Sequence, residues 1–188
     1  MKIILVRHGM PAWDFRTPIS GREFAAWRQG EDAAPIDPSH RPSAALEGLV
    51  RDASCVAAST LRRSLESARL LAPATAPLID ATFREAELPS RIRLGLRLPP
   101  ELWGLFARSA WFCGWSAGVE SFRAARARAV RAATLLATCA AEHGTVALVG
   151  HGLMNVFIAR RLRAAGWSGP RLTPQRHWGY ASYERIAA

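Results

Sequence analysis

Three short segments of the sequence combine arginine, histidine, serine and glycine directly after apolar runs. They are Arg7-His8-Gly9, Ser59–Arg63 and Gly150-His151-Gly152. Apolar runs of four to six residues are typical of buried strands. Because ligands bind beyond the carboxyl ends of parallel strands, a parallel sheet would bring Arg7, His8, Arg63 and His151 together.

These four side chains would suit a phosphoryl group. Two guanidinium groups offer planar sets of donors that match phosphate oxygens. A neutral imidazole such as that of His8 can attack phosphorus without prior deprotonation. Helices that start after Ser59 and Gly152 would add free N–H groups and partial positive charge, which also favour an anion. The segments therefore predict phosphoryl transfer, in which positioning and charge stabilisation do most of the work.

The elements that must position these residues alternate between strands and helices. This order predicts an α/β fold, a three-layer α/β/α sandwich with a mostly parallel central sheet, in a single domain over residues 1–188. The last strand is expected at an edge of the sheet. The predicted strands cover residues 2–6, 55–58, 77–80, 145–149 and 179–185, and the predicted helices cover 22–29, 43–51, 101–113, 121–143 and 153–165. A further helix, capped by Ser59 or Thr60, is expected to run to Leu71.

Composition excludes several functions. The formal net charge is +10, and Lys2 is the only lysine, so a phosphate-binding loop that ends in Gly-Lys-Ser/Thr is absent. No run of basic residues interleaved with aromatics is present, so nucleic acid is not expected as a partner. No apolar run approaches the ~20 residues of a membrane helix, and no signal peptide follows Met1. We expect a cytoplasmic protein without membrane association.

Five segments, in the same order along the chain, resemble the histidine phosphatase superfamily, also called the phosphoglycerate mutase-like family. The first is Leu5–Gly9, which resembles the family's amino-terminal signature. The others resemble its second-arginine segment, its general-acid segment, the start of its long helix and its second-histidine motif: Ala58–Ala68, Phe83–Glu85, Gly118–Ser121 and Val149–Gly152.

The resemblance implies a metal-independent phosphatase that hydrolyses a phosphomonoester, without a cofactor. His8 would be the nucleophile and become phosphohistidine, and Glu85 would protonate the leaving oxygen. Arg7, Arg63 and His151 would hold the phosphoryl group, with Ser59 as a further candidate at this site. The partner would be a phosphorylated small molecule. The alternatives are a mutase, a protein-phosphohistidine phosphatase and, from another class, a phosphate-binding module without turnover.

Several assignments stay open. Arg62 competes with Arg63, but the two point about 100° apart on a helix, and the spacing favours Arg63. Glu87 competes with Glu85 as the acid. Asp14 stands where the family often has asparagine, and an ionised carboxylate facing the site would repel the substrate.

Other residues are expected to have structural roles or to cover the substrate. We expect residues 84–118 to form a substrate-covering insertion and its tryptophans to be mainly core. The arginines of helix 121–143 are expected on a solvated face. His40, His143 and His177 are expected to be surface or packing residues.

Overall fold

The computed structural model describes residues 1–186, so the last two residues of the predicted domain lie outside it. The central sheet has five strands in the order β4-β3-β6-β1-β7. Four of them run parallel, and β7 pairs with β1 in the antiparallel direction. The strands are β1 (Lys2–Arg7), β3 (Cys55–Ala58), β4 (Leu78–Ile79), β6 (Thr145–Gly150) and β7 (Tyr180–Glu184).

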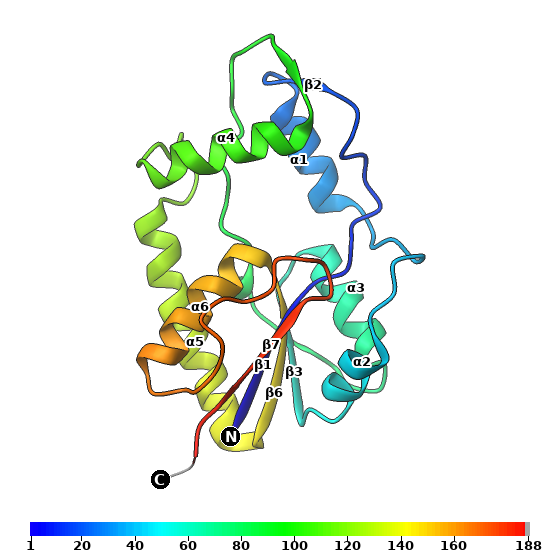
Figure 1. Ribbon diagram of the computed structural model, residues 1–188, viewed down its shortest axis with the longest axis vertical. Coiled ribbons are helices and arrows are strands. Elements are labelled where there is room, and N and C mark those ends of the chain that lie inside the picture. Colours follow the sequence, from blue (N-terminus) through cyan, green and yellow to red (C-terminus); the bar gives the residue numbers. More distant parts are fainter. Residues whose placement is uncertain (187–188) are drawn as a thin grey trace.

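Two pairs of helices cover the two faces of this sheet (Figure 1). One face carries α5 and α6, and the other carries α2 and α3. Alternate residues of β1 pack into the hydrophobic cores on the two faces of the sheet, because successive side chains of a strand point to opposite faces. Ile3 and Leu5 pack against α5 and α6, whereas Ile4 and Val6 pack against α2 and α3. The helices are α2 (Ala44–Arg51), α3 (Arg62–Leu71), α5 (Phe122–His143) and α6 (Gly152–Ala164). The predicted α/β sandwich is confirmed.

A second, smaller unit lies beyond the carboxyl ends of the parallel strands, at the top of Figure 1. We call it the cap; it comprises residues 15–33 and 84–118. It holds α1 (Phe24–Ala33), α4 (Pro100–Phe112) and a two-stranded sheet of β2 (Ile19–Ser20) and β5 (Arg97–Leu98). The cap has its own small core, in which Phe24, Ile92 and Trp103 are buried together.

The cap partly differs from the expectation for this region. Residues 84–118 lie over the end of the sheet, but residues 15–33 form the other half of the same unit. Trp103 and Trp111 are core residues, as predicted, and Trp115 is exposed. The short strands β2 and β5 and the 3-10 helix η1 (Ala81–Phe83) were not predicted, since they are only two or three residues long and, unlike β4, lie in no apolar run.

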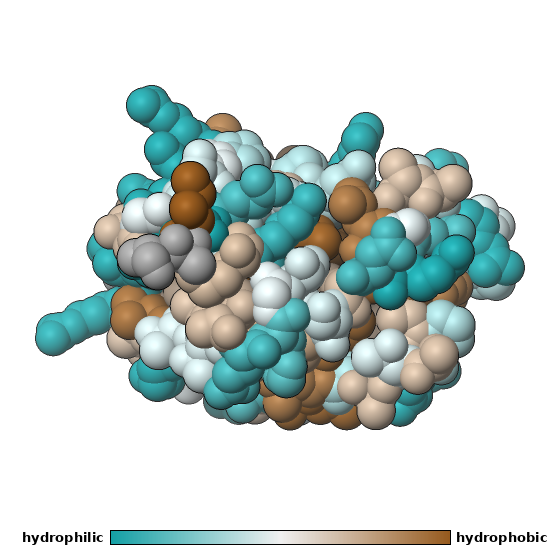
Figure 2. All heavy atoms as spheres, turned by 90° about the horizontal axis from the view of Figure 1, so that it is seen from below, coloured by the Kyte–Doolittle hydropathy of each residue, from teal (hydrophilic) through white to brown (hydrophobic). Residues whose placement is uncertain are grey.

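The end of the molecule opposite to the cap has a mixed surface. Figure 2 views this end and shows hydrophilic side chains projecting around it, with apolar atoms in small, separated areas between them. Among residues 1–186, no helix is both long enough and apolar enough to cross a membrane.

Candidate active site

His8 lies where β1 ends, beneath the cap. Its backbone N–H donates to the carbonyl of Gly150 at 3.1 Å, so the pairing of β1 with β6 continues one residue past the strand. The next N–H, of Gly9, donates to Ser67 Oγ of α3 at 2.9 Å. A Cβ at Gly9 would lie 2.3 Å from the indole of Trp178, so only glycine fits here. These contacts fix the backbone on both sides of the imidazole.

The hydrogen bonds of His8 also fix its tautomer. Nδ1 lies 2.7 Å from the Gly9 carbonyl, which can only accept, so Nδ1 carries the hydrogen. Nε2 accepts from Nε of Arg63 at 3.1 Å. Burial, with His151 and Arg63 adding their effect, lowers the pKa of His8 well below its ordinary value of 6.5. The imidazole is therefore neutral at neutral pH, and its lone pair is on Nε2.

The guanidinium group of Arg63 contacts this imidazole, and that of Arg7 is near enough to lower the pKa of His8. Arg63 of α3 is buried and also donates from Nη1 to Asp32 Oδ1 of α1 at 2.7 Å. Arg7 donates from Nη1 to the Gln175 carbonyl, and its buried Nε has no partner among the described residues. Burial lowers the pKa of Arg7 from its ordinary value, while the nearby carboxylates of Glu85 and Glu31 raise it. Arg62 is exposed on the outer side of α3.

His151 is completely buried at the start of α6, with its ring centroid 5.0 Å from that of His8. Its Nε2 is 2.7 Å from Ser59 Oγ. The predicted capping of the following helix by Ser59 or Thr60 is wrong, because α3 begins only at Arg62, although Ser59 Oγ does accept from the N–H of Leu61. Nδ1 of His151 is buried without a partner within residues 1–186. Burial, followed by Arg63 and Arg7, lowers the pKa of His151 well below 6.5.

Such an orphaned polar atom needs an explanation, because buried polar groups are normally hydrogen-bonded. His151 Nδ1 and Arg7 Nε are two buried polar atoms without a hydrogen-bond partner in one small region. Together with the donors of Arg63, they make a polar site whose hydrogen-bonding capacity is incompletely used. A tetrahedral oxyanion with several acceptor oxygens would satisfy it.

Glu85 lies close to this cluster, but its carboxylate has an additional function. Its oxygens accept from the backbone N–H groups of Leu153 at 3.2 Å and Met154 at 3.0 Å, in the first turn of α6. The first turn of α6, expected to receive phosphate, therefore already binds a carboxyl group of the chain itself. Glu87 is exposed and accepts from the N–H of Glu120 at 3.3 Å.

Asp14 is not brought together with the other candidates. It is exposed, and its Oδ1 accepts from the backbone N–H groups of Arg16 at 2.8 Å and Thr17 at 3.1 Å. Hydrogen bonds, that of the Thr17 hydroxyl first, lower the pKa of Asp14. The carboxylate shapes a turn of its own segment and does not face His8.

The structure adds residues to the site that the sequence did not indicate. His177 was expected at the surface or in packing, but its ring centroid lies 5.3 Å from that of His8, and burial lowers its pKa to about 4. Asp32 contacts Arg63 directly. Arg128 was expected on a solvated face, but it pairs with Glu120 and donates to the carbonyls of Thr82 and Arg84. None of these residues lies in a recognisable motif; only their positions in the fold identify them.

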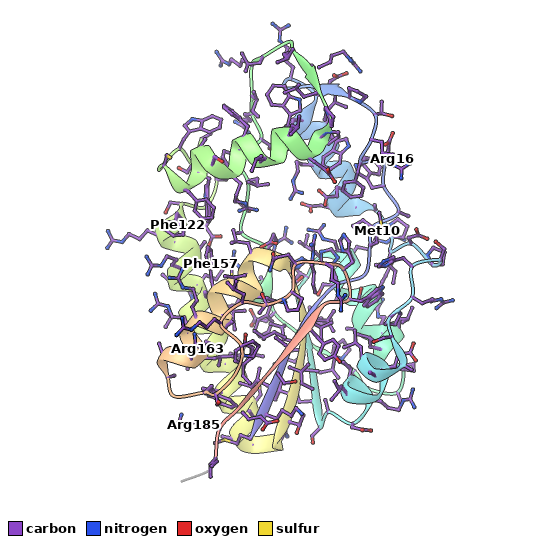
Figure 3. The ribbon with its side chains drawn as sticks, viewed as in Figure 1. Met10, Arg16, Phe122, Phe157, Arg163 and Arg185 are labelled. Carbon is purple, nitrogen blue, oxygen red and sulfur yellow. The ribbon has the colours of Figure 1, made fainter. Side chains whose placement is uncertain are left out.

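A cleft of about 620 Å³ separates the cap from the end of the sheet. Arg7 and His177 line the cleft, and the ring of His177 lies against that of His8. Met10 and Arg16 also line it and lie along the segment that rises from β1 to the cap (Figure 3). The cap supplies the remaining walls. These are Phe15, Phe24, Trp27, Arg28, Glu31, Leu88, Pro100, Glu101 and Gly104.

Comparisons with known proteins agree with this geometry. A family model described as the histidine phosphatase superfamily (branch 1) matches residues 3–187. Among solved structures, a mycobacterial glucosyl-3-phosphoglycerate phosphatase with bound VO3 is 22% identical, with a TM-score of 0.58 over 86% of this chain and 81% of that one. No curated protein shows significant sequence similarity.

Two further solved structures are similar. A mutant phosphoserine phosphatase of Entamoeba histolytica in complex with phosphoserine is 16% identical, with a TM-score of 0.58 over 96% of this chain and 89% of that one. A putative α-ribazole-5'-P phosphatase of Escherichia coli is 19% identical, with a TM-score of 0.56 over 85% and 79% of the two chains. At these identities the solved structures establish the fold alone.

Proposed function

Since the chain belongs to the histidine phosphatase superfamily, we propose that it hydrolyses a phosphomonoester of a small molecule through a phosphohistidine intermediate on Nε2 of His8. The observation that carries this proposal is the state of His8. The imidazole is neutral and buried, its hydrogen is held on Nδ1 by the Gly9 carbonyl, and its Nε2 is directed at Arg63.

In the first step, Nε2 attacks phosphorus as the bond to the ester oxygen breaks. In the free protein the lone pair of His8 Nε2 accepts a hydrogen bond from the Nε–H of Arg63. When the substrate binds, this N–H donates to a phosphoryl oxygen instead, and the lone pair of Nε2 is free to attack. Arg7 and His151 supply the donors left unused in the free protein. Positive charge around the equatorial oxygens stabilises the transition state.

In the second step, water attacks the phosphohistidine, gives a proton to the Glu85 carboxylate left by the first step, and breaks the P–N bond. Inorganic phosphate leaves, and His8 returns to its neutral form with the hydrogen on Nδ1. No metal ion is required in either step, because the arginines and the imidazole of His151 provide the electrostatic stabilisation that phosphoryl transfer needs.

The leaving alkoxide of the first step needs a proton, and we assign its donor to Glu85. Its nearness to Arg7, and so to the phosphoryl site, supports this role. Its carboxyl group accepts two backbone hydrogen bonds on Oε1 and one on Oε2, so Oε2 keeps a lone pair that can carry the proton. Glu87, which faces the start of α5, is the alternative.

The volume and cover of the cleft favour a small molecule over a phosphorylated protein. A cleft of about 620 Å³ lies within the ~300–1,000 Å³ typical of small-molecule sites. The cap lies over the carboxyl end of the sheet (Figure 1), which narrows the approach for a protein partner.

The test is turnover of phenyl phosphate by the purified protein, with and without EDTA. We expect hydrolysis that EDTA leaves unchanged, and a loss of at least several hundredfold in the folded His8→Ala variant. Phosphate binding without turnover would instead identify a binding module. Transfer of the phosphoryl group to an added alcohol in preference to water would identify a mutase.

A further inference from the structure

The cap presents an aromatic wall to the cleft beside the phosphoryl site. Phe15 and Trp27 both line the cleft, with their rings in edge-to-face contact at 5.4 Å between centroids. Phe24 is completely buried and stacks behind Trp27 at 6.1 Å. Leu88 and Pro100, from the other half of the cap, continue the apolar lining.

This wall is held in position by hydrogen bonds as well as by packing. Trp27 Nε1 donates to the backbone carbonyl of Asp14 at 2.9 Å. The Asp14 carboxylate in turn accepts from the N–H of Arg16, which fixes the turn that carries Phe15. Both aromatic side chains are therefore positioned before a ligand arrives. A preformed apolar surface with few polar groups is typical of sites for small molecules.

The aromatic wall and the phosphoryl site share one cavity. Arg7 and His177, which lie against His8, line the same cleft as Phe15 and Trp27. An ester whose phosphorus is at His8 must therefore extend its alcohol portion into the cleft. The basic Arg28 beside the wall is paired with Glu31, whereas Arg16, which also lines the cleft, forms no ion pair within residues 1–186.

We propose that the cleft is a subsite for a flat, apolar group, and that the substrates of this protein are phosphomonoesters whose alcohol carries an aromatic ring. This inference rests on the proposed phosphatase function and specifies its substrate class. The ring would stack on or against Trp27 and Phe15, because aromatic pairs favour edge-to-face and offset-stacked contacts.

The experiment compares esters that differ only in the ring. 3-Phenylpropyl phosphate and propyl phosphate release primary alkoxides of nearly equal basicity, so the ratio of their kcat/KM values reports binding of the ring and not leaving-group ability. We expect a ratio of roughly 10–100 for the wild-type protein. This ratio corresponds to the free energy gained when most of a phenyl ring is removed from water. In Trp27→Ala and in Phe15→Ala the ratio should fall at least fivefold.

Trp115→Ala is the matched control, because Trp115 is an exposed indole of the same cap that does not line the cleft. It should leave the ratio unchanged. Circular dichroism and thermal unfolding check that each variant is folded. If Trp27→Ala does not fold, Phe15→Ala alone tests the aromatic subsite, since Phe15 is only half-buried.

The experiment distinguishes failure of the aromatic subsite from failure of the proposed phosphatase function. A wild-type protein that hydrolyses both esters with a ratio near 1, or whose ratio is insensitive to both substitutions, would overturn the aromatic subsite and leave the phosphatase function standing. If neither ester is hydrolysed, the proposed function fails. Calorimetry with 3-phenylpropyl phosphonate and propyl phosphonate then tests the subsite alone, and equal affinities would overturn it.

Discussion

Asp32 places a carboxylate directly on an arginine that the proposed mechanism needs for phosphate. Its Oδ1 lies 2.7 Å from Arg63 Nη1 and 4.0 Å from Arg28 Nη2. An incoming phosphoryl group must therefore share or displace this ion pair. We predict that Asp32→Asn, which keeps a hydrogen-bond acceptor and removes the charge, tightens the binding of inhibitory oxyanions.

The size of the effect follows from the position of Asp32. A carboxylate about 5 Å from a phosphoryl charge repels it by about 3 kcal/mol at an effective dielectric constant near 20. The Asp32 side chain is 37% exposed, so solvent screening reduces this repulsion to about 1 kcal/mol. The inhibition constant of vanadate should fall by about fivefold.

The assay is competitive inhibition by vanadate and by phosphate at two ionic strengths, with the larger gain at low salt. Asp52→Asn is the control, because it makes the same change of net charge at an exposed position at the end of α2. Unchanged or weaker inhibition in Asp32→Asn would mean that Asp32 and the anion do not compete for Arg63, which would refute the reasoning.

Three other predictions follow from the same contacts. Glu85→Gln should lower kcat/KM about 10²–10⁴-fold for alkyl phosphates and much less for nitrophenyl phosphate, whereas Glu87→Gln should change neither; a steeper dependence on leaving-group pKa in the Glu87 variant would reverse the assignment. Gly9→Ala should cost about 1–3 kcal/mol in denaturant unfolding, because its Cβ would meet the Trp178 indole; an unchanged unfolding midpoint would contradict this. The free energy of unfolding should fall as pH falls from 6.5 to about 4, since the unfolded state then protonates His177 while the folded state keeps it neutral; His177→Gln should make this dependence shallower.

The sequence identifies the sheet, its flanking helices and the clustered side chains, because these depend on local patterns. The apolar runs before His8 and His151 are long enough to predict strands, and parallel pairing then places both residues at one edge. The choice of Arg63 over Arg62 also follows from local geometry. Two neighbours on a helix face different directions, and only Arg63 is buried.

The rest of the site depends on contacts between distant segments, which leave no local pattern. His177 lies in an irregular loop, and only the return of β7 beside β1 brings its ring to His8. Asp32 meets Arg63 because α1 folds back from the cap over α3. Asp14 stands near a motif in the sequence, but an Asx-type turn directs its carboxylate to its own backbone.

The most direct test of the account is the identity of the residue that carries the phosphoryl group during turnover. The protein is mixed with a phosphorus-labelled aryl phosphate, quenched in alkali within one turnover, and digested for mass spectrometry. We expect one acid-labile, base-stable phosphoryl group on Nε2 of His8, absent from His8→Ala. A label on another residue, or turnover without a covalent intermediate, would contradict the role assigned to His8.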